Sequence, residues 1–290
     1  MKPFKGIFTA LLTPFDANRQ VNEKELEKLV AYNVAKGVTG FYVCGSTGEA
    51  FLLSARERMQ IMEIVKRSAP EHTLIAHIGS LNERDAADLA RCARKLGYDA
   101  VSSVAPFYYK FTFEEIYQYY SRLADAAELP MLVYHFPAFS GVQMGMNEMA
   151  RFLEDDRFMG LKYTSNDFFT LEQCKTRFAN KIVYNGFDEM FLSGLAMGAD
   201  GGIGSTYNFM AEKFVAMQKL FAAGKLAEAR KIQQEANRII AVMCQVGVMQ
   251  AEKEVLNQLG FDFGKCLPPF REPTPEQKQL IAAEILPYIR

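Results

Sequence analysis

Short apolar segments alternate with longer amphipathic segments along most of this sequence, and this alternation limits the possible folds more than any other feature. Eight segments have the length and composition of buried strands: Gly6–Leu12, Gly40–Cys44, Thr73–Ile78, Ala100–Ala105, Met131–Phe136, Met159–Tyr163, Ile182–Tyr184 and Gly202–Gly204. Seven segments between them have helical periodicity: Asn22–Ala35, Ser54–Ser68, Asn82–Lys95, Thr112–Ala127, Met146–Leu153, Phe168–Phe178 and Glu189–Met197. Strands that alternate with helices predict a mostly parallel sheet.

Two architectures fit this order, a closed (β/α)₈ TIM barrel and an open, doubly wound sheet. The eight strand segments and the lack of a dinucleotide-binding loop favour the barrel. Local signals support the helix limits. Ser54 with Glu57, and Asn22 with Glu25, resemble N-terminal capping boxes. Glycines are expected to cap helix C-termini at Gly37, Gly97 and Gly198.

From about Asn208 the strand pattern stops and only helical periodicity remains. Helices are expected at Glu212–Ala223, Leu226–Gln245 and Val248–Leu259, and after Pro273-Thr274-Pro275. We therefore expect residues 1–207 to form the α/β barrel that carries the site. Residues 208–290 should form C-terminal helices that pack on the barrel as part of the same structural unit.

Composition excludes several classes of protein. The 290 residues are 49% hydrophobic with a formal charge of −1, so they can bury a large core and have no basic excess for nucleic acid. We find no secretory h-region and no apolar run that could span a membrane. The five cysteines are scattered without a Cys-x-x-Cys pair, which argues against disulfides and zinc and predicts a cytoplasmic protein.

No cofactor-binding or metal-binding motif is evident. The three histidines show no His-Glu-x-x-His spacing, and neither a Walker motif nor a dinucleotide fingerprint occurs. We therefore expect no metal and no organic cofactor. Any catalysis should come from side chains.

Lys162 lies near the carboxyl end of the short apolar segment Phe158-Met-Gly-Leu-Lys-Tyr-Thr-Ser165. Burial removes water from a lysine ammonium and lowers its pKa from the ordinary value of about 10.4. A neutral lysine amine can add to a carbonyl and form a Schiff base, so Lys162 is a candidate nucleophile. The alternative is a structural lysine whose ammonium extends to water.

Other polar residues follow strands whose carboxyl ends a barrel would bring to one face. The turn Gly45-Ser-Thr-Gly-Glu49 offers hydroxyls and backbone N–H groups that suit a small anion such as a carboxylate, although it also fits an ordinary turn. Tyr134 ends the fifth strand. Beside a Schiff-base lysine it could transfer protons; otherwise it is a core tyrosine with a bonded hydroxyl.

Asp188 and Glu189 follow the seventh strand. Their carboxylates would accept hydrogen bonds from sugar hydroxyls and would repel phosphate, so an unphosphorylated, polyhydroxylated substrate fits better than a phosphorylated one. The alternative is an acidic first turn that stabilises a helix N-terminus. A lysine, a tyrosine, an anion-binding turn and an acidic pair thus follow four different strands.

Six motifs occur in a recognisable order: Gly45-Ser-Thr-Gly-Glu-Ala-Phe51, Pro106-Phe-Tyr-Tyr109, Tyr134-x-x-Pro-x-x-Ser-Gly141, Leu161-Lys-x-Thr-Ser165, Tyr184-Asn-Gly-Phe-Asp-Glu189 and Gly198-Ala-Asp-Gly-Gly-Ile-Gly-Ser-Thr-Tyr-Asn208. Together they resemble the pyruvate-dependent class I aldolases, the family of N-acetylneuraminate lyase and dihydrodipicolinate synthase. The resemblance runs from Lys5 to about Pro269. It implies a cofactor-free lyase of sialic acid catabolism that reversibly cleaves N-acetylneuraminate to N-acetylmannosamine and pyruvate, and it implies a homotetramer built from two tight dimers.

The resemblance also assigns roles to residues. It implies that Lys162 forms the Schiff base, that Tyr134 is the general acid and base, and that Ser46 and Thr47 hold the pyruvyl carboxylate. Ser46, Tyr134 and Tyr108 would form a proton relay, with Tyr108 supplied by a neighbouring subunit. The residues implied to bind the sugar portion are Thr164, Gly186, Asp188, Glu189 and Ser205.

One position bears on the choice within the family. The synthases carry an arginine two residues after the proline of the Tyr-x-x-Pro motif, and this chain has Phe139 there. A carboxylated second substrate would lose its bidentate partner, which favours the lyase. His135 and Cys44 also depart from the common residues, asparagine and glycine. Strand alternation places His135 on the face opposite Tyr134, so we expect it outside the site.

Three alternatives stay open. The first is a related aldolase for another 2-keto-3-deoxy sugar acid, and the second is a dihydrodipicolinate synthase. The third is a non-catalytic barrel that binds sialic acid or pyruvate. Such a binding protein would not be expected to keep both Lys162 and Tyr134.

Overall fold

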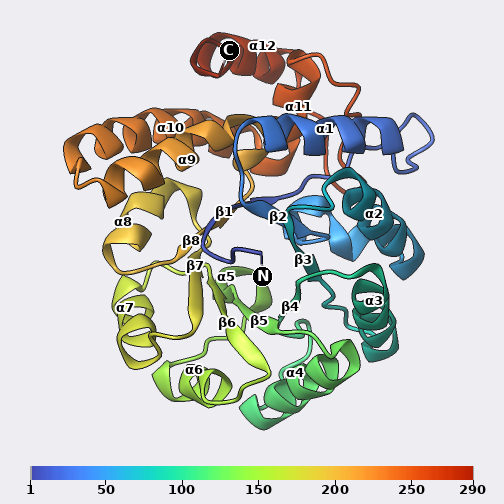
Figure 1. The fold of residues 1–290 in the computed structure, drawn as a ribbon. Coiled ribbons are helices and arrows are strands. Elements are labelled where there is room, and N and C mark those ends of the chain that lie inside the picture. Colours follow the sequence, from blue (N-terminus) through green and yellow to red (C-terminus); the bar gives the residue numbers. More distant parts are fainter. Residues whose placement is uncertain (1, 290) are drawn as a thin grey trace.

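Eight parallel strands close into a barrel in the computed structural model, which describes residues 2–289 (Figure 1). The strands are β1 (Gly6–Ala10), β2 (Gly40–Val43), β3 (Thr73–His77), β4 (Ala100–Val104), β5 (Met131–His135), β6 (Phe158–Tyr163), β7 (Ile182–Asn185) and β8 (Gly201–Gly204). Each strand pairs with the next along the chain, and β8 pairs with β1 to close the cylinder. The expected barrel is confirmed, and the open sheet is excluded.

Most of the helices surround the barrel (Figure 1). The helices are α1 (Glu23–Ala35), α2 (Ala55–Ser68), α3 (Glu83–Leu96), α4 (Phe113–Ala127), α5 (Pro137–Ser140), α6 (Met146–Leu153), α7 (Phe168–Arg177), α8 (Phe191–Ala196), α9 (Tyr207–Ala222), α10 (Leu226–Val246), α11 (Val248–Gln258) and α12 (Pro275–Glu284). The short α5 lies near the centre of this view, and α12 lies outside α11 and α1 (Figure 1). Four short 3₁₀ turns also occur: η1 (Ser46–Gly48), η2 (Ala50–Leu52), η3 (Asp188–Met190) and η4 (Leu286–Tyr288). No helix within residues 2–289 is long and apolar enough to cross a membrane.

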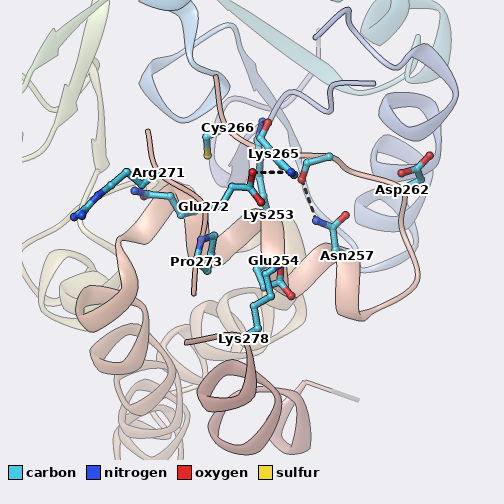
Figure 2. A pocket seen from close by; sticks show the side chains of 12 residues that line it. Lys253, Glu254, Asn257, Asp262, Lys265, Cys266, Arg271, Glu272, Pro273 and Lys278 are labelled. Atoms are coloured by element: carbon cyan, nitrogen blue, oxygen red, sulfur yellow. Dashed lines mark hydrogen bonds and ion pairs between the residues drawn. The ribbon is translucent and has the colours of Figure 1, made fainter. Parts of the chain in front are cut away.

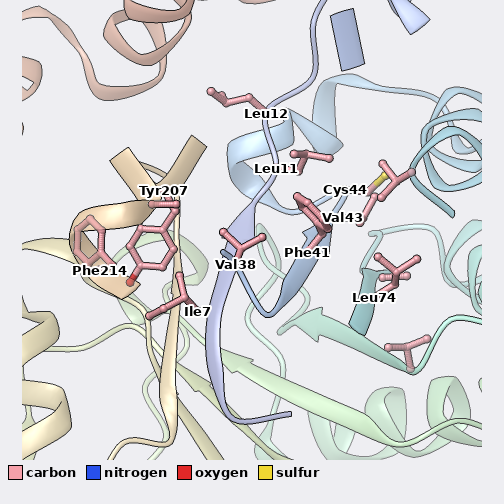
Figure 3. Close-up of a cluster of buried hydrophobic side chains, with 14 of the residues drawn as sticks. Ile7, Leu11, Leu12, Val38, Phe41, Val43, Cys44, Leu74, Tyr207 and Phe214 are labelled. Carbon is pink, nitrogen blue, oxygen red and sulfur yellow. The ribbon is translucent and has the colours of Figure 1, made fainter. Parts of the chain in front are cut away.

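The helix after β8 begins earlier than the sequence predicts. α9 starts at Tyr207 and not at Glu212, and its backbone leaves helical geometry at Met210, where the helix is kinked. Tyr207 and Phe214 of this helix lie beside Ile7 of β1 (Figure 3). α9 is thus the outer helix that follows β8, and the expected division after residue 207 falls inside it. The helices added to the barrel are α10, α11 and α12.

Strand alternation separates two apolar cores. Side chains such as Phe8, Tyr42 and Tyr184 fill the inside of the barrel. The larger core lies between the strands and the surrounding helices (Figure 3). Because successive strand residues face opposite sides, each strand contributes to both cores.

Helix ends follow the expected signals in part. The Ser54 hydroxyl accepts from the backbone N–H of Glu57, and the Glu57 carboxylate accepts in return, so this capping box is confirmed. The Asn22 side chain also accepts from Glu25, but the Glu25 carboxylate accepts from the backbone N–H of Asp262 and leaves that box incomplete. Gly37, Gly97 and Gly198 adopt positive φ values of 81°, 70° and 91°, as helix ends require.

Candidate active site

A cavity of about 290 Å³ opens at the carboxyl ends of the strands. Its lining contains nine of the ten candidate residues, all except Tyr108: Ser46, Thr47, Tyr134, Lys162, Thr164, Gly186, Asp188, Glu189 and Ser205. These residues come from loops and strands far apart in the sequence. The barrel therefore brings the predicted nucleophile, tyrosine, anion-binding turn and acidic pair into one pocket.

Lys162 is buried at the base of this pocket, with 4% of its surface exposed. Its neighbours in register are Tyr134 of β5 and Tyr184 of β7. Its Nζ lies 4.3 Å from the ring centre of Tyr42 and 4.0 Å from that of Tyr134. Burial lowers the pKa of Lys162 to about 7, against the opposing effect of the Asp188 carboxylate. A large fraction of the amine is therefore neutral near pH 7, as a nucleophile requires.

Tyr134 is buried beside Lys162 on the adjacent strand. Burial raises its pKa well above the ordinary tyrosine value, the Thr164 and Ser46 hydroxyls lower it, and Asp188 raises it. The phenol is therefore protonated near neutral pH and can donate. Tyr42 packs edge-on against it, with 6.1 Å between ring centres. Sequence reasoning missed Tyr42 because an aromatic residue within an apolar strand carries no signal beyond packing.

A buried ion pair anchors the anion-binding turn. Ser46 and Thr47 lie in η1, and Glu49 after it adopts a left-handed φ of 59°. The Glu49 carboxylate lies 2.6 Å from Nζ of Lys253 in α11 and accepts from the backbone N–H of Leu267 at 2.6 Å. The ion pair thus links the turn to the C-terminal helices.

The loop after α11 completes this anchorage. Lys253 also donates to the carbonyl of Lys265 at 3.1 Å, and Asn257 donates to that of Gly264 at 2.9 Å (Figure 2). The same loop therefore contacts the lysine that holds the anion-binding turn.

Asp188 lies in η3 at the opposite side of the pocket. Its Oδ2 accepts from the backbone N–H and the hydroxyl of Thr206, at 2.9 and 2.7 Å. Its Oδ1 has no hydrogen-bond partner within residues 2–289. Burial raises the pKa of Asp188 to about 6, although the Thr206 bonds lower it. Near pH 7 it is mostly a carboxylate, and one of its oxygens is buried without a protein donor in the described part of the chain.

The acidic pair is supported from α10. Gln233 donates to the carbonyl of Asp188 at 3.1 Å, and Asn237 donates to that of Glu189 at 3.1 Å. Glu189 itself is exposed at the pocket edge. These contacts fix the turn that carries both carboxylates.

Gly186 and Thr164 lie against each other. A Cβ at Gly186 would lie 1.8 Å from Oγ1 of Thr164, so only glycine fits without displacing the threonine. The Thr164 hydroxyl is buried and forms no hydrogen bond of normal geometry among the described residues, although it lies close enough to Tyr134 to lower the pKa of that phenol.

Tyr108 lies outside this pocket. Its side chain is 84% exposed and packs edge-on against Tyr109, with 5.1 Å between ring centres. Its backbone has a φ of 79°, which is unusual for a residue other than glycine. Within one chain, therefore, the third member of the expected relay is not assembled.

Cys44 and His135 do not line the pocket. His135 pairs in register with Tyr163 on the outer side of the barrel and stacks on it with 5.2 Å between ring centres. The expected opposite orientation to Tyr134 is confirmed. Cys44 is buried in the outer core with its Sγ 3.5 Å from the carbonyl of Arg58.

Several apolar residues that line the pocket carried no sequence signal. Phe136 and Phe139 stack at 4.2 Å between ring centres, and Phe139, at the position where the resemblance places an arginine in the synthases, lines the pocket. The C-terminal helices add Ile240, Cys244, Val248 and Met249. Such residues in amphipathic helices resemble an ordinary packing face. No cluster of three or more potential metal-ligating side chains occurs in the described part of the chain.

The model of the dihydrodipicolinate synthetase family matches residues 3–286. This chain belongs to the dihydrodipicolinate synthetase family. An N-acetylneuraminate lyase of Rhizobium meliloti is 44% identical over 269 residues, which cover 92% of this chain and 90% of the relative.

Solved structures of similar proteins have the same fold as this chain. CdNal of Clostridium difficile, in complex with mannosamine, has a TM-score of 0.96 at 38% identity, with 99% of each chain covered. An N-acetylneuraminate lyase of Fusobacterium nucleatum has a TM-score of 0.94 at 36% identity, with 99% of each chain covered. A dihydrodipicolinate synthase of Bacillus anthracis reaches a TM-score of 0.93 at 29% identity, with 98% of each chain covered. Because lyases and synthases of this family share the fold so closely, the pocket must separate the two activities.

Proposed function

We propose that this protein is a Schiff-base aldolase that reversibly cleaves N-acetylneuraminate to N-acetylmannosamine and pyruvate. The observation that carries the proposal is the buried Lys162 amine, with its lowered pKa, beside the Tyr134 phenol in a pocket bounded by an anion-binding turn and an acidic pair.

In the first step Nζ of Lys162 attacks the C2 ketone of the open-chain sugar acid, and loss of water gives an iminium. The hydroxyls and backbone N–H groups of the turn at Ser46 and Thr47 bind the adjacent carboxylate. This contact orients the reacting carbon, which lowers the entropic cost of reaction. The iminium then acts as an electron sink for cleavage.

In the second step the C3–C4 bond breaks and Tyr134 mediates the transfer of the C4 hydroxyl proton. N-acetylmannosamine leaves with a new aldehyde. The enamine that remains on Lys162 is protonated at carbon and hydrolysed to pyruvate, which regenerates the amine. The atoms balance without any redox step, so we propose that no metal or organic cofactor takes part.

The sugar portion extends toward the acidic side of the pocket. We propose that Asp188 and Glu189 accept hydrogen bonds from its hydroxyls, with further polar contacts to Thr164, Ser205 and the backbone at Gly186. Oδ1 of Asp188 and the hydroxyl of Thr164, which line the pocket and have no hydrogen-bond partner of normal geometry within residues 2–289, support this assignment. Phe139 at the pocket supports a lyase over a synthase, because it offers no partner to a second carboxylate.

We further propose that the protein acts in the cytoplasm as a homotetramer of two tight dimers. Its five cysteines are all unpaired thiols, as is usual in reducing compartments. Exposed aromatic side chains at Tyr108, Tyr109 and Phe111 support a subunit contact near the pocket, through which Tyr108 would enter the partner's site.

The test is pyruvate release from N-acetylneuraminate by the purified protein, with Lys162→Ala as the matched variant. The proposal predicts turnover by the wild type and none by the variant. Turnover of a different 2-keto-3-deoxy sugar acid, without release from N-acetylneuraminate, would replace this substrate by a related one. Equal activity in both proteins would reject Lys162 as the nucleophile.

A further inference from the structure

Glu252 in α11 is a buried acid that the proposed mechanism does not use. None of its surface is exposed, and neither carboxyl oxygen has a hydrogen-bond partner within residues 2–289. An isolated buried carboxylate is strongly unfavourable, so this group needs either a partner or a proton. The groups around Glu252 indicate whether its carboxyl has a charged partner or a bound proton.

Glu252 lies behind the sugar side of the pocket. Val248 and Met249, four and three residues earlier in α11, line the cavity and lie on the same face of the helix as Glu252. The hydroxyl of Ser205 and the carboxylate of Asp188, which both line the cavity, lie close enough to act on the ionisation of Glu252, although the Ser205 contact does not have hydrogen-bond geometry in the single chain. Glu252 is therefore adjacent to two residues assigned to the sugar portion.

The Glu252 carboxyl forms no ion pair within residues 2–289. The next residue, Lys253, forms its ion pair with Glu49. The ionisable groups of neighbouring elements in this region are Asp188 and Glu189 of η3, Tyr207 of α9, Cys244 of α10 and Cys266 of the loop after α11. The cavity also contains Lys162, which acts on Asp188. Burial raises the pKa of Glu252 to about 8; Ser205 lowers it and Asp188 raises it.

We propose that Glu252 is a neutral carboxylic acid that positions Ser205 for the sugar portion of the substrate, and that loss of its proton weakens binding of that portion. This inference rests on the proposed function. The acid O–H donates to Oγ of Ser205, so the serine O–H points to the substrate. A carboxylate could only accept from Ser205, which would turn the serine away and place a second negative charge near Asp188.

The test compares Glu252→Gln and Glu252→Leu with the wild type in pyruvate release from N-acetylneuraminate between pH 7 and 9.5. Glutamine keeps a donor at every pH, whereas leucine removes it. Glu254→Gln is the control, because Glu254 lies on the same helix but forms an ion pair with Lys278 at 3.3 Å, away from the cavity. Borohydride capture of pyruvate measures the reaction without the sugar portion.

In the wild type and in Glu254→Gln, KM should rise about three- to tenfold between pH 7.5 and 9, as loss of one hydrogen bond implies. In Glu252→Gln, KM should stay level over this range. In Glu252→Leu it should be raised by a similar factor at every pH. Pyruvate capture should be equal in all four proteins. A Glu252→Gln profile parallel to the wild type, or an unchanged KM in Glu252→Leu, would overturn the proposal.

Infrared spectroscopy separates this inference from the proposed function. At pH 7 the wild type should show a protonated carboxyl band that is missing in Glu252→Gln and shifted in Ser205→Ala. This result supports the neutral acid and its contact with Ser205 even if the wild type releases no pyruvate from N-acetylneuraminate. Absence of the band overturns the inference, whatever the activity.

Discussion

At the scale of single residues, the site depends on burial that makes the ordinary charged form of a side chain unfavourable. Lys162 has a lowered pKa and Asp188 a raised one, each chiefly because of burial. Both shifts move an ionisation toward neutral pH, where a nucleophile and a hydrogen-bond acceptor can coexist. Such groups usually reduce the stability of the fold, and this cost can be measured.

Lys162→Met should stabilise the protein, and the gain should depend on pH. Between about pH 7 and the ordinary lysine value of 10.5, the unfolded chain holds more protons at Lys162 than the folded one. The free energy of unfolding therefore rises with pH in this window, and the variant loses that slope. Urea unfolding should show a gain of up to roughly 4 kcal/mol at pH 7 that is much smaller at pH 10. The same gain at both pH values would argue against a depressed pKa.

Asp188→Asn should shift the acidic limb of the pH profile for kcat/KM to lower pH. The Asp188 carboxylate favours the ammonium form of Lys162, so its removal lowers the lysine pKa below the wild-type value of about 7. The profile of kcat/KM reports this ionisation in the free enzyme. Glu189→Gln, at the exposed neighbour, should raise KM without moving the limb. Equal shifts in the two variants would show that Asp188 does not set the charge of Lys162.

At the scale of elements, α11 connects the C-terminal helices to both sides of the pocket. Lys253 supports the anion-binding turn through Glu49, while Val248 and Met249 line the cavity and Glu252 is proposed to position Ser205. The sequence predicts this helix within one residue of its observed end. It does not indicate this role, because a run of charged residues in an amphipathic helix usually marks a solvated face.

Lys253→Met should destabilise the protein by about 3–5 kcal/mol, because it leaves the buried Glu49 carboxylate without its partner. The lysine and glutamate side chains are 2% and 0% exposed. Lys225→Met is the control, because Lys225 and Glu228 form an exposed pair at 3.5 Å that should contribute less than about 1 kcal/mol. Denaturant unfolding measures both losses. Similar losses in the free energy of unfolding for the two variants would contradict the claim that a buried Glu49 carboxylate needs its lysine partner more than an exposed carboxylate does.

The sequence predicts the strands and most of the polar residues of the pocket, but not the contacts that form only when the barrel closes. Periodicity predicts all eight strands, since a barrel strand must be apolar on both faces. Resemblance collects nine residues that share the pocket. Neither periodicity nor resemblance indicates a role for Tyr42 or Glu252, because their roles depend on which side chains the closed barrel places next to them. Periodicity also does not predict the early start of α9, because the helix continues beyond its periodic segment where it packs against β1.

At the scale of the whole molecule, one chain forms a pocket without Tyr108. Its exposed side chain leaves the proposed relay open until a second chain supplies it. If Tyr108 acts across a subunit contact, two inactive variants can repair each other. Variants at Tyr108 and at Tyr134, each combined with a Lys162 variant, can test this, because only Tyr108 lies outside the pocket of its own chain.

Coexpression of Tyr108→Phe with Lys162→Ala should give mixed assemblies with more activity than either variant alone. In such an assembly a site can combine Lys162 of one chain with Tyr108 of another. Tyr108→Phe alone should lose at least about tenfold in kcat, as expected for removal of a proton-transfer group. Coexpression of Tyr134→Phe with Lys162→Ala should give no recovery, because those residues share one chain's pocket. Recovery in both mixtures, or in neither, would contradict a Tyr108 contribution from the partner.

The most direct measurement of the central claim is borohydride reduction in the presence of pyruvate, followed by peptide mapping by mass spectrometry. A Schiff-base aldolase should carry one reduced pyruvyl group per chain, on the peptide that contains Lys162. Lys162→Ala should remain unmodified. Modification at another lysine, or no adduct in the wild type, would contradict the assignment of Lys162 as the nucleophile.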